Sequence, residues 1–469
     1  MCAMNNFDPS EHEFRIGDLA LSRRRLLQKA GMGMGSLSLA MLLSNAMASS
    51  ARADAAVNPL APKNPPLPAK AKHVIHIFAA GGPSHVDTWD YKPALAKYAD
   101  QQLPGLGGLS FPSPYKFAKK GKSGLEVSDV FPHLGDCVDD MTVIKSLYTD
   151  VPDHGIASRF MHTGSLQIPK PSMGSWVVYG LGTENQNLPG FISIGGDAEA
   201  RQASFLPSVY QGVGVNYSRG APLDQILLNI RSPFTTLDDQ RYQIALAREL
   251  DKIHAEKLHK DDQLETRIES FEMAFKMQTE ATDAFDIMKE PEAVRKAYGE
   301  TDTGARMLVA RRLVERGVRF VQVFAGGWDH HSQLEVQLKR RAEDIDQPAA
   351  ALIQDLKQRG LLESTLIIWG GEFGRTVTVD TREATPGRNH NGKGFCCWMA
   401  GGGVKGGMSY GQTDEFGDRA EINRVHIHDL HATVMALLGF DHKKLTYRYN
   451  GRDFRLTDNY GDVVRDIIA

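Results

Sequence analysis

The sequence predicts an α/β fold with a mainly parallel sheet between helices and a helical insertion. Apolar runs of strand length alternate with longer segments of helical periodicity along most of the chain. One such run, 320–325, has Gln322 as its single polar residue, which is typical of a strand buried on both faces. The exception to the alternation is the stretch 237–298, which is highly charged and poor in glycine and is expected to be the helical insertion.

The first 53 residues have the pattern of an export signal. Arg23 and Arg24 precede an apolar centre rich in glycine and serine, and the pair resembles the twin-arginine signal, which sends folded proteins across a membrane. Cleavage is expected after Ala53. A membrane anchor is the alternative, but the apolar part is shorter than the roughly 20 residues that span a bilayer. We expect a periplasmic or secreted protein, with the twin-arginine export machinery as a partner and membrane contact only through an uncleaved signal.

The folded part is expected to begin at Lys72, after a proline-rich tether at 54–71. No internal repeat stands out, so we predict one domain over 72–469 that contains the insertion. The expected order is a strand ending at Ala80, a helix and strand within 129–147, a short helix at 156–161, the insertion, a helix and strand within 304–327, a helix ending near Gly360, strands within 364–376 and 394–403, and a helix at 429–440.

Charge and cysteine content exclude some classes of partner and framework. Acidic and basic residues nearly cancel, with a formal net charge of -3, so no nucleic acid is expected as a partner. Of the four cysteines, Cys2 lies in the signal, and the odd number left shows no disulfide framework. We expect Cys137, Cys396 and Cys397 to be buried small apolar residues. The sequence leaves the oligomeric state open.

Residues of metal-ligand type follow three predicted strands and two later turns. Ligands gather where the strands of an open α/β sheet end, so these side chains are expected to form one site. Carboxylates with imidazoles suit zinc, manganese or a related divalent ion better than calcium, and the number of ions stays open. The predicted metal ligands are Asp87, Asp329, His331, Glu372, His390 and His428.

Each of these residue types also has an ordinary structural explanation. An acidic residue after a strand is often a helix cap, and a lone histidine is usually a hydrogen-bonded surface group. We prefer that explanation for His85, His330 and His431. For Glu372, a simple ion pair with Arg375 is the alternative.

The segment 364–376, STLIIWGGEFGRT, resembles the metal-binding strand end of sulfatases and their relatives in the alkaline phosphatase-like superfamily. Glu372, Phe373 and Gly374 take the places of an Asp-His-Gly motif there. Phenylalanine cannot bind a metal, so the resemblance implies that the imidazole comes from elsewhere, with His390 as the candidate. By the same resemblance, the first metal aspartate is Asp87 and the middle pair is Asp329 and His331.

Taken whole, the mature chain resembles the bacterial family called domain of unknown function 1501. The resemblance rests on the twin-arginine signal and on GGPSHVDTWD, HTG, EFGRT, GGGVKGG, HDLHATVMALLG and YNGRDFRLTD. It implies an alkaline phosphatase-like fold and an ester hydrolase as the activity class, although fold kinship alone does not establish function.

At the superfamily's nucleophile position this sequence has a histidine. That position lies a fixed distance before a Thr-Gly pair, and counting back from Thr163 and Gly164 gives His154. Three roles are open for it: a phosphoryl acceptor, a further metal ligand, or a sign that no covalent step occurs. The reserve nucleophile is Ser158, and the candidates for holding an anionic oxygen are Arg159 and Arg375.

The expected function is that of an exported metal-dependent hydrolase of phosphate or sulfate esters. It would act on an anionic ester substrate with divalent metal ions, zinc or manganese, as the cofactor. The alternative is a catalytically inactive, metal-stabilised binding or scaffold protein of the cell envelope, which the lack of Ser, Thr or Cys at position 154 favours. A third interpretation is that the insertion at 237–298 binds a partner protein.

Overall fold

The computed structural model describes residues 58–167, 169–226, 236–258 and 282–469. The chain divides into two units. One comprises 1–48 and 227–279 and includes helix α8, Leu237–Leu258; the other comprises 49–226 and 280–469 and contains the sheet. Helix α8 lies within the predicted insertion, whereas residues 282–298 belong to the unit with the sheet. The predicted signal lies outside the described residues, and within them no helix combines the length and apolarity that a membrane crossing needs.

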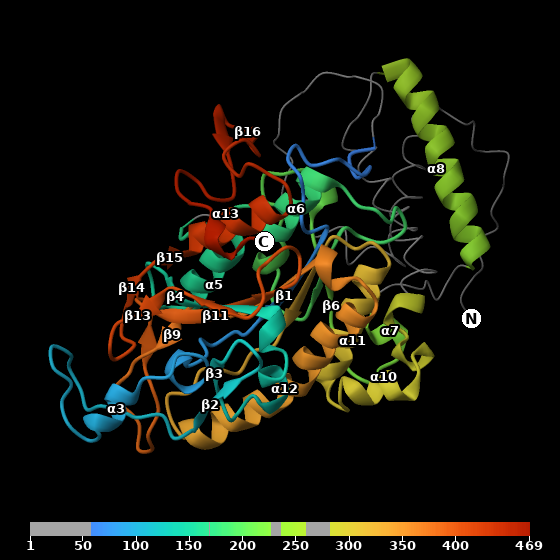
Figure 1. Ribbon diagram of the computed structural model, residues 1–469. Helices are drawn as coiled ribbons and strands as arrows, with labels where there is room; N and C mark the ends of the chain where they lie inside the picture. The colour runs from blue at the N-terminus through green and yellow to red at the C-terminus, as the bar shows by residue number, and fades with distance from the viewer. Residues whose placement is uncertain (1–57, 168, 227–235, 259–281) are drawn as a thin grey trace, which may run out of the picture. The chain divides into compact units, whose positions relative to one another are not determined.

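A nine-stranded sheet forms the centre of the larger unit (Figure 1). Its hydrogen-bonded order is β12-β4-β11-β8-β1-β7-β5-β6, and β15 pairs with β4. Every pair is parallel except the two that involve β11, so the predicted mainly parallel α/β sheet is confirmed. The strands are β1 His73–Phe78, β4 Met141–Tyr148, β5 Phe191–Ile194, β6 Val213–Val215, β7 Phe320–Phe324, β8 Thr365–Gly370, β11 Phe395–Ala400, β12 Met408–Tyr410 and β15 Val425–His426.

The reversed direction of β11 follows from its connection to β8. A parallel neighbour requires a crossover that carries the chain back to the starting edge of the sheet, and that crossover is usually a helix. The connecting residues 371–394 contain no helix and instead form an antiparallel hairpin of β9 (Gly374–Arg375) and β10 (His390–Asn391). The chain therefore re-enters the sheet at the edge where it left, and β11 runs antiparallel to β8.

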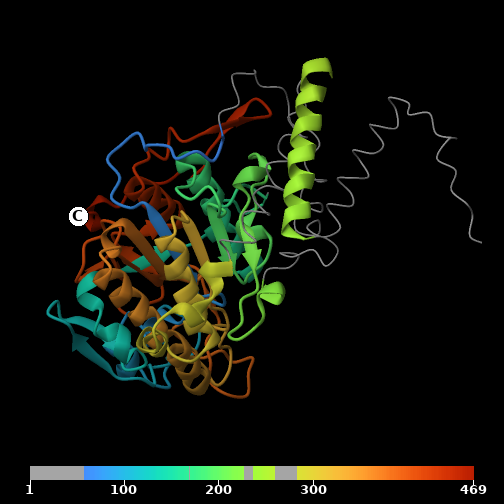
Figure 2. The ribbon, with the colours of Figure 1, turned by 90° about the vertical axis from the view of Figure 1, so that its right-hand side faces the viewer.

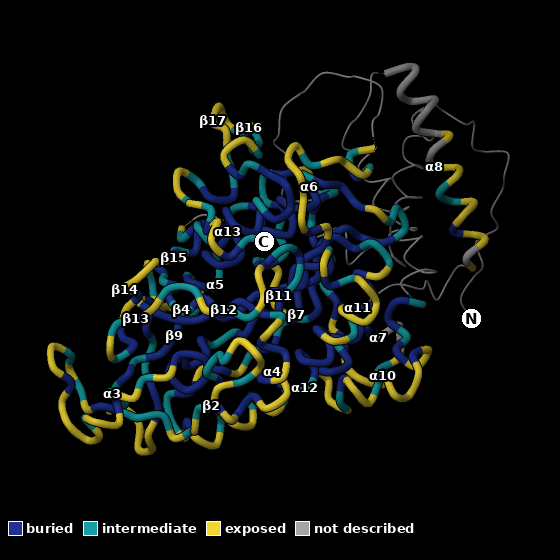
Figure 3. The backbone as a smooth tube through the Cα atoms, in the orientation of Figure 1, coloured by how far each residue is buried: buried dark blue, intermediate teal, exposed yellow. Residues whose placement is uncertain are grey.

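Helices cover both faces of the sheet, because strands that are apolar on both sides need two covering layers. Figure 1 shows α11 and α12 below the sheet and α5, α6 and α13 above it, and Figure 2 shows the same unit turned by 90°. Every residue of β1, β8 and β11 is buried, and the dark tube in Figure 3 follows these strands. The helices of this unit are α3 Pro93–Lys97, α4 Pro132–Gly135, α5 His154–Thr163, α6 Met173–Leu181, α7 Leu223–Ile226, α10 Glu292–Ala297, α11 Asp302–Glu315, α12 Leu334–Gln358 and α13 Ile427–Leu437.

Smaller elements decorate the edges of the unit. Besides the β9–β10 hairpin, three further antiparallel pairs stand apart from the main sheet. These are β2 Phe117–Lys120 with β3 Leu125–Ser128, β13 Gln412–Thr413 with β14 Ala420–Ile422, and β16 Tyr447–Tyr449 with β17 Arg452–Phe454.

Residues 58–71, predicted as part of a tether, run along the surface of the domain. Leu67 N donates to Gly439 O at 3.0 Å, and Ala71 N donates to Leu437 O at 2.9 Å. Proline-rich composition disfavours a helix or strand, but the remaining amides and carbonyls still bind neighbouring elements. The composition therefore predicts the lack of regular structure in this segment but not its docking.

The three cysteines among the described residues are free and buried, as predicted. Cys396 and Cys397 lie in β11, and burial is the main cause that raises the pKa of each thiol. Burial also raises the pKa of Cys137 to about 11. These side chains therefore remain protonated at neutral pH and act as small apolar groups.

Candidate metal centre

Three neighbouring parallel strands bring their carboxyl ends to one edge of the sheet. Strand β1 pairs with both β7 and β8, so that Phe78 lies opposite Phe324 on one side and Gly370 on the other. The chain leaves all three strands at the same level, and the following loops meet there. Gly81 N, after β1, donates to Glu372 Oε1, after β8, at 2.9 Å. Side chains from distant parts of the sequence can therefore reach one point.

Helix α5 starts at this edge. Asp153 caps the helix, because its Oδ1 accepts a hydrogen bond from Ile156 N at 3.2 Å. Gly164 ends the helix at φ 64, and a Cβ there would lie 2.1 Å from Leu456 O, so that position requires glycine. The helix therefore begins two residues before its predicted start, and His154 is its first residue.

The hairpin after β8 supplies a second imidazole. Arg375 in β9 pairs with His390 in β10. The buried guanidinium holds the hairpin against the loop after β1, since Arg375 Nε donates to Gly82 O at 2.9 Å and Nη1 donates to Arg388 O at 3.1 Å. His390 thereby lies next to the start of α5, with its Nδ1 2.9 Å from Pro152 O.

One carboxylate oxygen lies at the centre of the imidazoles. Asp329 Oδ1 is 3.2 Å from His154 Nε2 and 3.2 Å from His390 Nε2. Among the described residues, these three form the one group of possible ligands whose ligand atoms all lie within 4.8 Å of one another. His331 adds a fourth atom, because its Nε2 is 3.0 Å from Asp329 Oδ1 and 3.0 Å from His390 Nε2. We call His154, Asp329, His331 and His390 the metal-ligand cluster.

In His154 and His390 the other ring nitrogen, Nδ1, lies next to an oxygen that can only accept a hydrogen bond. His154 Nδ1 lies 2.6 Å from Glu372 Oε1, and His390 Nδ1 lies 2.9 Å from Pro152 O. A carboxylate or carbonyl oxygen can only accept, so each Nδ1 carries a proton, and a ring that loses its other proton to make room for an ion presents its lone pair at Nε2. These partners thus select the tautomer that a metal ligand needs.

His331 has the same arrangement. Its Nδ1 is 2.8 Å from Asp380 Oδ2 and 3.0 Å from Arg382 Nη2. The hydrogen bond from Arg382 is the main cause that holds the pKa of Asp380 well below its usual range. Asp380 is therefore an ionised acceptor, so the proton of His331 lies on Nδ1 and the short approach of Arg382 is not a hydrogen bond to that nitrogen.

The cluster therefore brings three imidazole Nε2 atoms within 3.2 Å of one carboxylate oxygen. Arg375 supplies positive charge on one side, because Nη2 donates to Asp329 Oδ1 and Nη1 lies 3.4 Å from His331 Nε2. His154 Nε2 nevertheless is buried and has no hydrogen-bond partner. Imidazole nitrogens and a carboxylate are the donors that zinc and manganese accept, so this set of residues fits a divalent ion.

The pKa shifts of His154 and Asp329 also favour positive charge in the metal-ligand cluster. The hydrogen bond with Glu372 raises the pKa of His154, and the charges of Glu372 and Asp329 add to it against the opposing effect of burial. For Asp329, burial raises the pKa, but the hydrogen bond and charge of Arg375 outweigh it and hold the pKa well below its usual range. A proton on His154 therefore competes with a metal ion for the same lone pair.

A family model matches residues 71–468 and bears the description "Protein of unknown function (DUF1501)". The chain belongs to the DUF1501 family. The family that the sequence resemblance named is thereby confirmed. No curated protein matches the sequence of this DUF1501 chain.

Several solved structures are similar to this DUF1501 chain at low sequence identity. The PsFucS1 sulfatase from Pseudoalteromonas sp. is 13% identical, with 79% of this chain and 68% of that chain covered and a TM-score of 0.33. A TAB5 alkaline phosphatase mutant with Mg bound is 10% identical, with coverages of 73% and 94% and a TM-score of 0.32. The C-terminal periplasmic domain of EcEptC from Escherichia coli, in complex with Zn, is 9% identical, with coverages of 86% and 97% and a TM-score of 0.35.

Three predicted ligands of the DUF1501 chain lie outside the metal-ligand cluster: Asp87, His428 and Glu372. Both oxygens of Asp87 bind Arg388, at 2.7 Å from Nε and 3.0 Å from Nη2, in an ion pair with no exposed surface. A buried guanidinium requires such a partner, and this pairing gives Asp87 a structural role. His428 lies in α13, where its ring stacks on Tyr460 and lies next to His431.

The other predicted site residues divide between the cluster and its surroundings. Glu372 lies beside the cluster and binds it through His154. Arg375 contacts the cluster directly through Asp329. Arg159 is held by the carboxylate of Glu199 and donates from Nη1 to Leu166 O at 3.3 Å, so its charge is already paired.

Sequence reasoning missed the partners that orient the imidazoles. Asp380 lies in an irregular loop between the two strands of the β9–β10 hairpin, with no neighbouring motif to single it out. The acceptor for His390 is a backbone carbonyl, that of Pro152, which no side-chain pattern can indicate. The one available signal for Asp380 was an acidic residue two positions before Arg382, and that spacing is common in turns.

Replacing Asp380 with asparagine should weaken divalent-metal binding by about 10- to 100-fold, the usual effect of losing the outer partner of a metal-binding histidine. Asparagine keeps an acceptor but removes the charge that favours a proton on His331 Nδ1. Zinc affinity is measured by competition with a chromophoric chelator. Asp140→Asn is the control, because Asp140 pairs with the exposed Lys357 at 2.7 Å. An Asp380→Asn affinity equal to that of the wild type would contradict the orienting role.

Proposed function

We propose that this DUF1501 protein is an exported metal-dependent hydrolase of phosphate or sulfate esters. The observation that carries the proposal is the convergence of three Nε2 atoms and Asp329 Oδ1 at the carboxyl ends of β1, β7 and β8. Asp329 keeps 45% of its side-chain surface exposed, so the cluster is open to a substrate from the solvent. Buried structural metal sites are closed on all sides, whereas catalytic sites keep an open position.

A divalent ion held by the cluster would make a water molecule more acidic and stabilise negative charge on the transferred phosphoryl or sulfuryl group. The residues of the chain supply the orientation. Glu372 and Asp380 fix two imidazoles through their Nδ1 atoms. Arg375, which is fully buried, holds Asp329 in place. Such fixed donors favour the reaction because they do not have to reorganise during it.

We assign His154 the role of a ligand in this reaction. Its Nδ1 binds Glu372, and its Nε2 lies within the metal-ligand cluster, where an ion would occupy it, so neither nitrogen would be free to attack a substrate. The ester would then be cleaved by direct attack of water: the new bond joins the water oxygen to phosphorus or sulfur, and the alcohol leaves with a proton. No group of the protein becomes covalently modified.

The exposed cation beside the cluster is Arg382, which keeps 60% of its side-chain surface accessible. Its Nη2 lies 3.0 Å from His331 Nδ1 and donates to Asn389 Oδ1 at 2.9 Å. Each of the three candidate arginines pairs with a carboxylate, but Arg382 is far more exposed than Arg159, at 25%, or Arg375, at 0%. We therefore propose that Arg382 meets the anionic part of the substrate.

The location is part of the proposal and rests on the sequence. A signal of the twin-arginine type would export the protein folded, to the periplasm or beyond. Cell fractionation of the wild type and an Arg23→Lys, Arg24→Lys variant tests this: the variant should stay in the cytoplasm.

The deciding experiment combines elemental analysis of the signal-free protein with turnover of aryl phosphate, phosphodiester and sulfate ester substrates. Bound zinc or manganese together with hydrolysis supports the proposal. Bound metal without turnover across the panel favours the second candidate, a metal-stabilised binding protein, for which the histidine at position 154 is the supporting observation. Absence of any metal after reloading would refute both.

A further inference from the structure

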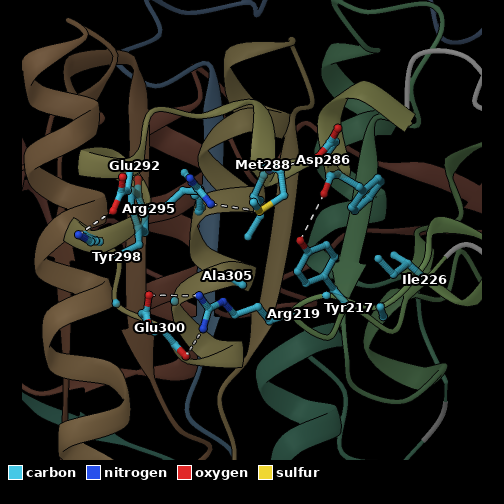
Figure 4. Close-up of a pocket in the computed structure, with 18 residues that line it drawn as sticks. Tyr217, Arg219, Ile226, Asp286, Met288, Glu292, Arg295, Tyr298, Glu300 and Ala305 are labelled. Carbon is cyan, nitrogen blue, oxygen red and sulfur yellow. Dashed lines mark hydrogen bonds and ion pairs between the residues drawn. The ribbon is translucent and has the colours of Figure 1, made fainter.

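A second feature of the sheet unit is a cavity of about 540 Å³ that none of the metal-ligand cluster lines. Its walls come from the segment after β6, from the short helix η6 (Ile287–Lys289), from α10 and from the start of α11 (Figure 4). A volume of this size falls in the range of small-molecule sites, roughly 300–1,000 Å³. The cavity is therefore large enough for a ligand of its own.

Most charged side chains that line the cavity neutralise one another. Arg219 Nη2 pairs with Glu300 Oε1 at 3.4 Å, and Lys296 Nζ pairs with Glu292 Oε1 at 2.7 Å. Asp286 caps η6, since its Oδ1 accepts from the backbone nitrogen of Met288. Each of these five charged side chains therefore has a partner within the protein.

Arg295 is the cation of the cavity that lacks a carboxylate. Among the residues that the structure describes, no acidic group pairs with it, and its Nη1 lies 3.2 Å from Met288 Sδ. Its Nε is buried and has no hydrogen-bond partner. A thioether is a weak acceptor, whereas a guanidinium carries five donors in a planar fork. The fork of Arg295 is therefore available to a planar anion.

The opposite wall of the cavity is apolar and aromatic. The rings of Tyr217 and Phe285 stack with centroids 6.3 Å apart and planes inclined by 27°. Ile226 and Leu308 are buried beside them. Figure 4 shows Tyr217 and Ile226 on one side of the cavity and Arg295 on the other. A ligand that spans the cavity would meet a cation at one end and a flat apolar surface at the other.

We propose that this cavity binds a small organic carboxylate with a flat apolar body. The carboxylate would accept two hydrogen bonds from Arg295, and the body would lie against Tyr217 and Phe285. A carboxylate fits better than a phosphate, because acidic side chains line the cavity as often as basic ones and a second negative charge would have no cation to meet. This site is independent of the proposed hydrolase.

The test uses the metal-loaded protein and three probes: 2-naphthoate, its neutral counterpart 2-naphthalenemethanol, and acetate. Calorimetry should show saturable binding of 2-naphthoate, with both other probes much weaker because each lacks one half of the recognition. Arg295→Gln should weaken 2-naphthoate binding by about tenfold or more, as expected for loss of a charge-assisted hydrogen-bond pair.

Two controls locate the binding. Lys296→Gln makes the same charge change on the same helix, but its ammonium is already paired with Glu292, so 2-naphthoate binding should be unchanged. His390→Gln, which removes a ligand of the proposed metal site without leaving a buried charge unpaired, should also leave the binding unchanged, which separates the cavity from a carboxylate bound to metal. The proposal is overturned if 2-naphthoate does not bind, if Arg295→Gln binds it as tightly as the wild type, or if His390→Gln abolishes the binding.

Discussion

Replacing Asp329 with alanine should abolish stable binding of a divalent ion and any metal-dependent ester hydrolysis. Its Oδ1 is the atom on which the Nε2 atoms of three histidines converge. The loss of affinity should exceed the about 10- to 100-fold effect of removing an outer partner, because a donor atom itself is lost. The measurements are metal content after dialysis and hydrolysis of the ester panel, each compared with the wild type.

A second variant distinguishes the loss of a metal ligand from the loss of the fold. Asp329 also pairs with the buried Arg375, and its removal leaves that guanidinium without a carboxylate, which destabilises the fold. His390→Gln removes a donor without leaving a buried charge unpaired, and it should lose metal while unfolding at the same urea concentration as the metal-free wild type. Full metal retention in both variants would show that the metal-ligand cluster is not the metal site.

The free energy of unfolding should fall steeply as the pH drops below about 6.5. The cause is a second group of four histidines, packed between β1 and helices α5 and α13, which we call the buried histidine group. Neighbouring rings lie close together, with centroids 5.8 Å apart for one pair and 6.2 Å for another. All four keep 4% or less of their surface exposed. The members are His76, His162, His428 and His431.

Burial keeps these imidazoles neutral in the folded state. It lowers the pKa of His162 to about 3, with a further contribution from His431. It lowers the pKa of His428 to about 3 and that of His431 to about 4, although the hydrogen bond from His431 to Met161 O opposes the shift. Since the unfolded histidines titrate near 6.5, the unfolded state binds more protons below that pH. Stability is therefore present above about pH 6.5 and is lost as the pH falls towards the folded pKa values.

The size of the effect is testable with single substitutions. Each buried histidine should contribute about 1.4 kcal/mol per pH unit to the slope between pH 6 and pH 4.5. Urea unfolding at several pH values should show a shallower slope for His162→Asn than for the wild type. His133→Gln, which removes an exposed imidazole, should leave the slope unchanged. Equal slopes in all three proteins would mean that the buried histidine group does not limit acid stability.

Much of the sheet could be predicted from the sequence, because its central strands are buried on both faces. The apolar runs at β1, β7, β8 and β11 have the length of strands, and glycines follow the end of all four. The antiparallel direction of β11 could not be read in this way. It depends on whether the chain crosses over or turns back at 371–394, and an irregular loop looks the same in either case.

The proximity of the candidate ligands was predictable where two ligand types stand together after a strand, as for Asp329 and His331. It was not predictable where a partner far along the chain determines the contacts of a residue. Asp87 has the position of a metal aspartate, but its partner Arg388 is 301 residues away. Sequence spacing carries no information on such a pairing, which depends on the folded arrangement of the hairpin against the loop after β1.

Binding of an ion by the metal-ligand cluster would depend on the folded state of the whole domain. His154 contacts Glu372 across 218 residues of sequence, and Asp329 contacts His390 across 61. An unfolded chain would have to close loops of this length to hold an ion, so an ion held by the metal-ligand cluster would bind the native state almost exclusively. Each tenfold rise in free metal above the dissociation constant would then add about 1.4 kcal/mol to the free energy of unfolding. The melting temperature of the protein would become a gauge of metal supply, and molecules without the ion would be the ones most readily removed by proteases.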